Sequence, residues 1–197
     1  KKNRARARIK FLVTQLGLDK FKQLVLEERA SLQNDPRWTT HLEEAASPSE
    51  TPLRNPEPIS THDIAAAGET FRKWMQTNVY QQRQAHYAVA TVALPLGDLT
   101  AQQMRSLAGI ARRYVGNTVR TTVEQNIVLR WVSEAELPSL YHDLNAVGLA
   151  ESGAGTISDV TACPGTDTCK LGIASSRGLA AELRARLSQE VGGLDAE

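Results

Sequence analysis

Two cysteines, Cys163 and Cys169, are the residues of this chain whose type and spacing most directly suggest chemistry. Pro164 and Gly165 stand between them and predict a loop that can bend. Such a loop can turn two thiolates toward one metal centre and, where it leads into a helix, can point backbone N–H groups at the sulfurs. An iron–sulfur cube takes four thiolates, so two are too few. From the residues alone, a buried pair of free thiols, a local disulfide or half of a zinc site shared between two chains stays open.

A second group of polar residues precedes the cysteines and consists of Arg120, Thr122, Gln125 and Asn126. Arg120 and Thr122 are two positions apart on a predicted strand and therefore face the same side. Gln125 and Asn126 fall in the turn that follows. A guanidinium, a hydroxyl and two amides close together suit a ligand that bears carboxylates. An exposed strand end with turn-forming polar residues is the alternative.

The elements that must position these residues follow from a change of hydrophobic period near residue 85. Short apolar runs predict strands, and residues 100–103 and 133–136 form capping boxes that predict the starts of two helices. Gly116 and Gly148 predict where those helices end. The predicted order is a strand at 86–94, a helix, strands at 119–123 and 126–132, a second helix and a strand at 155–161. This βαββαβ order predicts an α+β fold of the ferredoxin-like type, with both helices on one face of an antiparallel sheet.

The rest of the chain surrounds this predicted domain. Residues 3–30 are predicted to be helical, with a break at Gly17, and a helix is predicted over 62–78. Five of the eight prolines lie between residues 33 and 61, which predicts a linker or an extended strap. A final helix is predicted over 174–189.

Composition limits the classes of protein to which the chain can belong. A net charge of +1 argues against a general nucleic-acid binder, and no apolar run is long enough to span a membrane. Two cysteines are too few for a disulfide scaffold, and the charged first residues do not resemble a signal peptide, so we expect a cytoplasmic protein. The absence of an initiator methionine and the small polar residues at the end lead us to expect a segment of a longer polypeptide.

The two polar groups together, in this order, resemble the sirohaem-dependent nitrite and sulfite reductase family. In that family an Arg-x-Thr-x-x-Gln-Asn stretch in a ferredoxin-like half-domain precedes a Cys-x5-Cys loop. Residues 120–126 match the first motif, and residues 163–169 match the second. The segment 87–100 and the basic run from residue 3, with Gly17 and Phe21, are also similar to the family.

The resemblance implies an oxidoreductase that reduces nitrite to ammonia or sulfite to sulfide by six electrons, at a sirohaem coupled to a 4Fe–4S cluster. It implies that Cys163 and Cys169 are the first two cluster ligands. It also implies that Arg120, Thr122, Gln125 and Asn126 lie against the sirohaem, near its carboxylates. The implied electron donor is a ferredoxin or a flavoprotein.

The same resemblance implies what this segment lacks. The family's second cysteine pair would follow residue 197, and the half-domain with most of its substrate-binding basic residues would precede residue 1. We therefore expect the segment to need the missing halves of its own chain, to be inactive alone and to hold neither cofactor tightly. The alternative is a non-catalytic ferredoxin-like binding module with structural cysteines.

The implied domains can be stated by residue number. Residues 1–31 close a preceding half, residues 32–61 form the proline-rich linker, and residues 62–80 form a helix that leads into the next domain. Residues 81–155 form the ferredoxin-like half-domain, and residues 156–197 begin the α/β domain that holds the cluster and the sirohaem.

Overall fold

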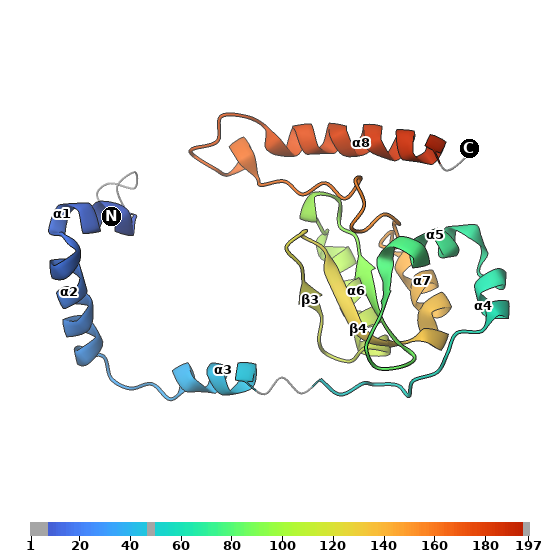
Figure 1. The fold of residues 1–197 in the computed structure, drawn as a ribbon, viewed down its shortest axis with the longest axis horizontal. Coiled ribbons are helices and arrows are strands. Elements are labelled where there is room, and N and C mark those ends of the chain that lie inside the picture. The colour runs from blue at the N-terminus through green and yellow to red at the C-terminus, as the bar shows by residue number, and fades with distance from the viewer. Residues whose placement is uncertain (1–7, 47–49, 195–197) are drawn as a thin grey trace. The chain divides into compact units, whose positions relative to one another are not determined.

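The structure is a computed structural model that describes residues 8–46 and 50–194. The chain divides into two compact units, Lys1–Ser49 and Glu50–Glu197 (Figure 1). Each unit is described by itself. None of the described helices is both long and apolar enough to cross a membrane.

The first unit consists of three helices. They are α1 (Ile9–Leu16), α2 (Leu18–Ser31) and α3 (Arg37–Ala46). The predicted break at Gly17 is confirmed, because this residue has a φ of 78° and separates α1 from α2. Helix α3 occupies part of the segment predicted to be a linker, and the Asp35 carboxylate accepts a hydrogen bond of 3.0 Å from the Arg37 N–H at its start. Neither α1 nor α2 has a buried residue, so these helices lack a core of their own.

The second unit contains a four-stranded antiparallel sheet and, among the described residues, five helices. The strand order is β1-β2-β4-β3, and the class is α+β, as predicted. The strands are β1 (Val79–Gln81), β2 (Tyr87–Val92), β3 (Arg120–Thr121) and β4 (Ile127–Ser133). The helices are α4 (Thr61–Ala66), α5 (Gly68–Asn78), α6 (Ala101–Tyr114), α7 (Leu137–Ala146) and α8 (Ser176–Leu194). Gly68, with a φ of 86°, separates α4 from α5 inside the single helix predicted over 62–78.

The hydrophobic core lies between this sheet and helices α5, α6 and α7. Trp74 of α5, Leu129 of β4 and Leu140 of α7 are each 0% exposed. Alternation along β2 places Ala88, Ala90 and Val92 in the same core. Burial of these side chains from water is the main force that holds the helices to the sheet.

The strand predicted at 155–161 is wrong, because this segment is a loop. The place beside β2 is taken by β1, which comes before β2 in the chain and pairs Tyr80 with Val89. Some backbone N–H groups of the loop and of the residues before it bond to side chains, and others form turns within the loop. The N–H groups of Gly153 and Ala154 donate to Asn78 Oδ1, and that of Gly155 donates to Asp159 Oδ2. A predicted βαββαβ order is therefore realised as ββαββα.

One of the two predicted capping boxes is confirmed. Thr100 Oγ1 accepts from the Gln103 N–H, and the Gln103 side chain accepts from the Thr100 N–H, so α6 starts as predicted. The box predicted at Ser133 and Glu136 is wrong. Ser133 is buried at the end of β4, and its hydroxyl accepts a 3.1 Å hydrogen bond from the Glu57 N–H.

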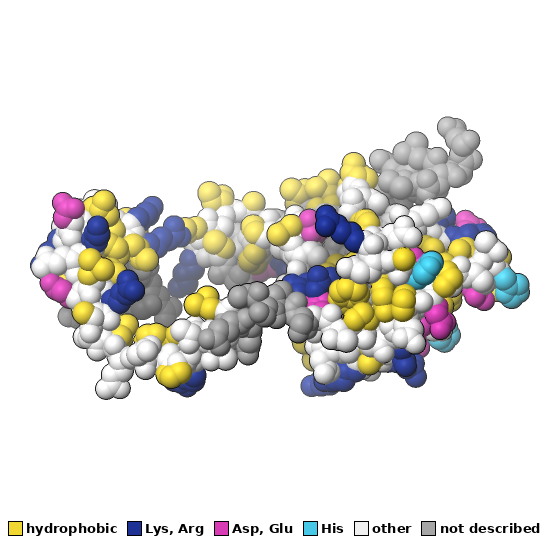
Figure 2. All heavy atoms as spheres, turned by 60° about the horizontal axis from the view of Figure 1, so that its bottom comes forward, with side chains coloured by type: hydrophobic (Ala, Val, Ile, Leu, Met, Phe, Trp, Pro, Cys, Tyr) yellow, Lys and Arg dark blue, Asp and Glu magenta, His cyan; other side chains and the backbone are white. Residues whose placement is uncertain are grey.

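Apolar side chains also lie at the surface of the molecule (Figure 2). In the first unit Ile9 and Leu18 are each 68% exposed, and in the second unit Ile173, close to the cysteines, is 98% exposed.

Candidate functional site

The segment around the cysteines folds into a tight loop that presents both thiols to solvent. Cys163 and Cys169 are free and exposed. A short 3-10 turn, Gly165–Asp167, lies between them, and the Cys169 N–H donates a 2.9 Å hydrogen bond to the Gly165 carbonyl oxygen. The loop is therefore ordered by its own backbone and leads into α8.

Two glycines make this loop possible. A Cβ atom on Gly165, which has a φ of 54°, would lie 2.3 Å from Ser176 Oγ. A Cβ atom on Gly172 would lie 2.8 Å from the carbonyl carbon of Gly165. Since real Cβ atoms do not come this close to other heavy atoms, only glycine fits at these positions without movement of the loop.

The environment of Cys163 favours its thiolate. Ser176 Oγ lies 3.4 Å from Cys163 Sγ and donates a 2.8 Å hydrogen bond to the Cys163 carbonyl oxygen. The Ser176 hydroxyl, followed by the Gly165 backbone N–H, holds the pKa of the Cys163 thiol below its ordinary value. The thiolate is the form that binds metals.

The polar turn predicted from the sequence is present between β3 and β4. The Gln125 N–H donates to the Thr122 carbonyl oxygen at 3.1 Å, and the Thr122 N–H donates to the Asn126 carbonyl oxygen at 3.0 Å. Gln125 has a φ of 67°, a conformation that is uncommon for a residue other than glycine. The turn therefore holds Thr122, Gln125 and Asn126 close together.

This turn is bonded to the segment that carries the first cysteine. Gln125 Nε2 donates a 3.0 Å hydrogen bond to the carbonyl oxygen of Ala162, the residue before Cys163. Thr161 Oγ1 donates to the Glu124 carbonyl oxygen at 3.4 Å. The two groups that the sequence singled out thus form one continuous structure.

Asn126 lies beneath the turn rather than at its surface, with 2% of its surface exposed. Its Oδ1 accepts a 2.8 Å hydrogen bond from the Leu94 N–H, and its Nδ2 donates a 2.7 Å bond to Asp159 Oδ2. Both ends of the amide are therefore engaged inside the chain. Asn126 connects the end of β2 to the loop that precedes Cys163.

Arg120 is placed differently from the other residues of the predicted group. It pairs with Val128 across β3 and β4, and its Nη2 donates a 2.7 Å hydrogen bond to Glu50 Oε1. Among the described residues its side chain has no hydrogen bond to the cysteine loop. Glu50 is a partner that the sequence did not predict, since the two residues are far apart in the chain.

The thiols fit part of a cluster-binding site. In the part of the chain that the structure describes, no group of three or more His, Cys, Asp or Glu side chains could hold a metal ion. The donor set is therefore two free, exposed thiols on one loop, which is half of what a 4Fe–4S cluster needs. The residues present fit the cluster to that extent, and other ligands would have to come from outside the described residues.

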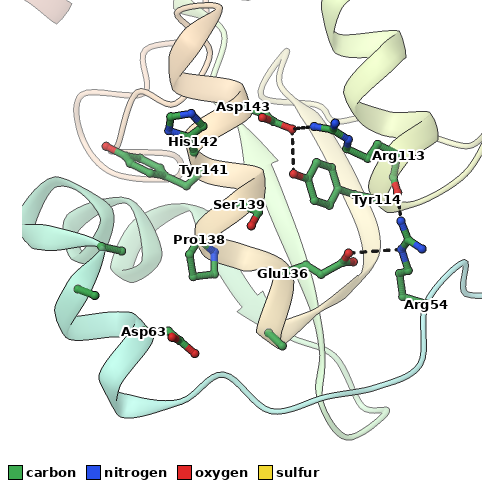
Figure 3. A pocket seen from close by; sticks show the side chains of 13 residues that line it. Arg54, Asp63, Arg113, Tyr114, Glu136, Pro138, Ser139, Tyr141, His142 and Asp143 are labelled. Atoms are coloured by element: carbon green, nitrogen blue, oxygen red, sulfur yellow. Dashed lines mark hydrogen bonds and ion pairs between the residues drawn. The ribbon is translucent and has the colours of Figure 1, made fainter.

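A cleft of about 890 Å³ lies elsewhere on the second unit, beside α6 and α7 (Figure 3). Several of its polar groups pair with one another: Arg113 and the Tyr114 hydroxyl both bind Asp143, and Arg54 binds Glu136. None of the predicted site residues lines this cleft. Its polar groups connect α6, α7 and the segment before α4.

Comparison with known proteins agrees with the fold. The sequence model described as "Nitrite/Sulfite reductase ferredoxin-like half domain" matches residues 80–147. Among solved structures, the Mycobacterium tuberculosis NirA protein is similar to 99% of this chain with a TM-score of 0.52 and 22% identity, over 31% of its own chain. This similarity shows a shared fold.

Three curated relatives are similar in sequence. The ferredoxin–nitrite reductase of Synechococcus elongatus is 23% identical over 96% of this chain and 31% of its own length. The assimilatory ferredoxin-dependent nitrite reductase of Haloferax mediterranei is 32% identical over 51% of this chain and 20% of its own length. The sulfite reductase (ferredoxin) 2 of Mycolicibacterium paratuberculosis is 28% identical over 94% of this chain and 29% of its own length. The chain thus spans at most about a third of the length of these relatives.

Proposed function

We propose that this chain is part of an enzyme of the nitrite and sulfite reductase family that reduces nitrite or sulfite, because residues 80–147 match the ferredoxin-like half domain of that family. The proposed cofactors are a sirohaem and a 4Fe–4S cluster, held by the longer protein of which this chain is a part. When bound, this pair would pass the six electrons of an external donor to the substrate. The names of the relatives lead us to propose a ferredoxin as the electron donor.

One observation carries the assignment of the site. The bond between Gln125 and Ala162 joins the polar turn to the cysteine loop, so a ligand that meets one also lies near the other. We assign Cys163 and Cys169 as two of the cluster ligands. The lowered pKa of Cys163 supports this, because a thiolate is the ligating form.

The residues of the turn take two kinds of role in this proposal. Arg120, Thr122 and Gln125 would hold the sirohaem, and the half-exposed Arg120 guanidinium would bind one of its carboxylates. Asn126 also belongs to the sirohaem site, but it acts by holding the turn, since its amide is engaged with Leu94 and Asp159. The proposed compartment is the cytoplasm, where two such thiols stay reduced.

The test is a pair of substitutions in the longer protein. Cys163→Ser and Cys169→Ser should each lower the iron content from about five atoms per chain, four in the cluster and one in the sirohaem, to about one or fewer and abolish methyl-viologen-dependent reduction of nitrite and sulfite. Thr168→Ser, on the same loop, is the matched control and should retain both. Full iron content in either cysteine variant would contradict the proposal, and about half a zinc per chain would favour a shared zinc site.

The 197-residue chain by itself provides a second test. We propose that it is inactive and holds neither cofactor tightly, because it supplies only two thiols. A purified sample of this chain with a sirohaem absorption band and reductase activity would show that this part of the proposal is wrong.

A further inference from the structure

A second cluster of charges surrounds Glu50, at the start of the segment that precedes α4. Its Oε1 accepts from Arg120 Nη2 at 2.7 Å. Its Oε2 accepts from Arg130 Nη2 and, at 3.1 Å, from the indole Nε1 of Trp131. One carboxylate thus receives hydrogen bonds from two arginines and a tryptophan on the neighbouring strands β3 and β4.

The carboxylate is the most buried of the three charged groups. The Glu50 side chain is 14% exposed, against 36% for Arg130 and 47% for Arg120. Burial raises the pKa of Glu50, but the hydrogen bonds from Arg130 and Arg120 outweigh it and hold the pKa below its ordinary value. The group is therefore ionised at neutral pH, and the three side chains together carry one net positive charge.

The fold is modified locally to build this cluster. Opposite Ala88 and Ala90, strand β4 contains an extra residue, which is a β-bulge. Trp131 lies in the bulge with a φ of 63°, a strained conformation for a bulky residue, and its N–H donates to Gln82 Oε1 at 2.7 Å. Bulges re-aim side chains, and here the indole packs edge-on against Tyr87 with its N–H on Glu50.

Other hydrogen bonds, which do not involve the Glu50 carboxylate, attach the segment that carries Glu50 to the second unit. Tyr87 donates its hydroxyl to the Arg54 carbonyl oxygen at 2.6 Å, and the Ala135 N–H donates to the Glu57 carbonyl oxygen at 3.0 Å. The Glu50 carboxylate is therefore not needed to tether this segment. The carboxylate instead binds the guanidinium groups of Arg120 and Arg130.

We infer that Glu50 is a positioning residue for Arg120, whose guanidinium it fixes at the edge of the sheet for an anionic group of the cofactor. Arg120 and Arg130 lie on adjacent strands, and without a carboxylate between them their like charges repel. Arg120 is half exposed and would then turn toward solvent. Glu50 engages one nitrogen of Arg120, and the other N–H donors make no hydrogen bond within the described residues. The inference rests on the proposed function only in naming the cofactor.

The first experiment measures the position of Arg120 without any cofactor. Phenylglyoxal labels accessible arginines, and peptide mass spectrometry gives the labelling rate of Arg120 in the 197-residue chain relative to Arg72, which is exposed on α5. Glu50→Gln keeps the shape of the side chain and removes its charge. This ratio should rise roughly threefold in Glu50→Gln, the scale of a partly exposed ion pair. Glu57→Gln, which changes an exposed carboxylate on the same segment, should leave the ratio unchanged.

The second experiment measures sirohaem content per chain in the longer protein. Glu50→Gln should lower it by roughly threefold, and Glu57→Gln should not change it. If the Arg120 labelling ratio is unchanged in Glu50→Gln, the inference is wrong. This holds even if proteolysis shows that residues 50–57 are more mobile in the variant. If the Arg120 labelling ratio changes in Glu50→Gln but the wild-type longer protein binds no sirohaem, the proposed function is wrong. The positioning of Arg120 by Glu50 is then still supported.

Discussion

Amide side chains organise the loops around the candidate site. Asn78 Nδ2 donates to the carbonyl oxygens of Thr91 and Glu151. Its Oδ1 accepts from the N–H groups of Gly153 and Ala154. Asn126 likewise bonds the Leu94 N–H, just after β2, to the Asp159 carboxylate through the two ends of its amide. Each amide replaces backbone bonds that a further strand would have made, and this satisfies the buried polar groups of an irregular segment.

Substitution of Asn126 should therefore be costly. Asn126→Ala leaves the Leu94 N–H without its partner and removes one of the two hydrogen bonds that Asp159 Oδ2 accepts, which should lower the free energy of unfolding by about 2–3 kcal/mol. Urea unfolding followed by tryptophan fluorescence measures this. Asn117→Ala, at an exposed position after α6, should change it by less than about 0.5 kcal/mol. An equal effect of both substitutions would contradict the assigned role of Asn126.

A pair of glycine substitutions tests the packing of the cysteine loop. Gly165→Ala should raise hydrogen exchange in residues 163–176 about tenfold, because a left-handed backbone costs a residue with a Cβ about 1–2 kcal/mol and the added atom meets Ser176. Gly109→Ala, in α6 with nothing within 4 Å of the added Cβ, should instead stabilise the protein by about 0.5–1 kcal/mol. Unchanged exchange in Gly165→Ala would show that the loop is looser than the structure indicates.

At the scale of elements, the contact between α6 and α7 contains a polar cluster as well as apolar core residues. Arg113 Nη1 and the Tyr114 hydroxyl of α6 both donate to Asp143 Oδ2 of α7, at 2.6 and 2.8 Å (Figure 3). Burial, and then the hydrogen bond to Asp143, raises the pKa of Tyr114 to about 12 from an ordinary value of 10.0. The two helices are thus joined by a group that titrates at alkaline pH.

The stability of this helix pair should fall as the solution becomes alkaline. Below pH 10.0 Tyr114 is protonated in the folded and the unfolded chain, so its contribution is fully present. Between pH 10.0 and about 12 the unfolded chain loses this proton first, and the free energy of unfolding should decrease by up to about 2–3 kcal/mol. Tyr114→Phe should flatten this part of the curve of urea midpoint against pH. An alkaline decrease that is equal in both proteins would assign it to other groups.

At the scale of the whole molecule, the chain consists of one unit with a core and one without. The described core residues all belong to the second unit, whereas α1 and α2 have no buried residue. Since burial of apolar side chains supplies most of the stability of a folded unit, the second unit should fold independently of the first. Exposed apolar residues such as Leu18 remain on the first unit.

Removal of the first unit tests this division. A chain of residues 50–197 should have the same free energy of unfolding in urea as the chain of residues 1–197, to within about 0.5 kcal/mol. Fluorescence of Trp74 and Trp131, which lie in the second unit, reports the transition. A clearly lower midpoint for the shorter chain would mean that the first unit contributes to the stability of the second.

Local rules predicted much of the fold of the second unit. The α+β class, helices α6 and α7, strands β2, β3 and β4, and the turn before Asn126 follow from hydrophobic period and turn residues, which act between near neighbours in the chain. The capping box at Thr100 was predictable for the same reason. For the site, the sequence indicated which residues to consider and which family the chain resembles.

The tertiary structure decided what near neighbours cannot. It placed Val79–Gln81 beside β2 and left residues 155–161 as a loop, in which the Gly155 N–H bonds to the Asp159 side chain. It engaged Ser133 with Glu57 instead of a helix cap. It also brought Glu50 to Arg120 across 70 positions of the chain. These contacts depend on how segments that are distant in the chain pack together. A pattern of neighbouring residues does not say which distant segment comes into contact with which.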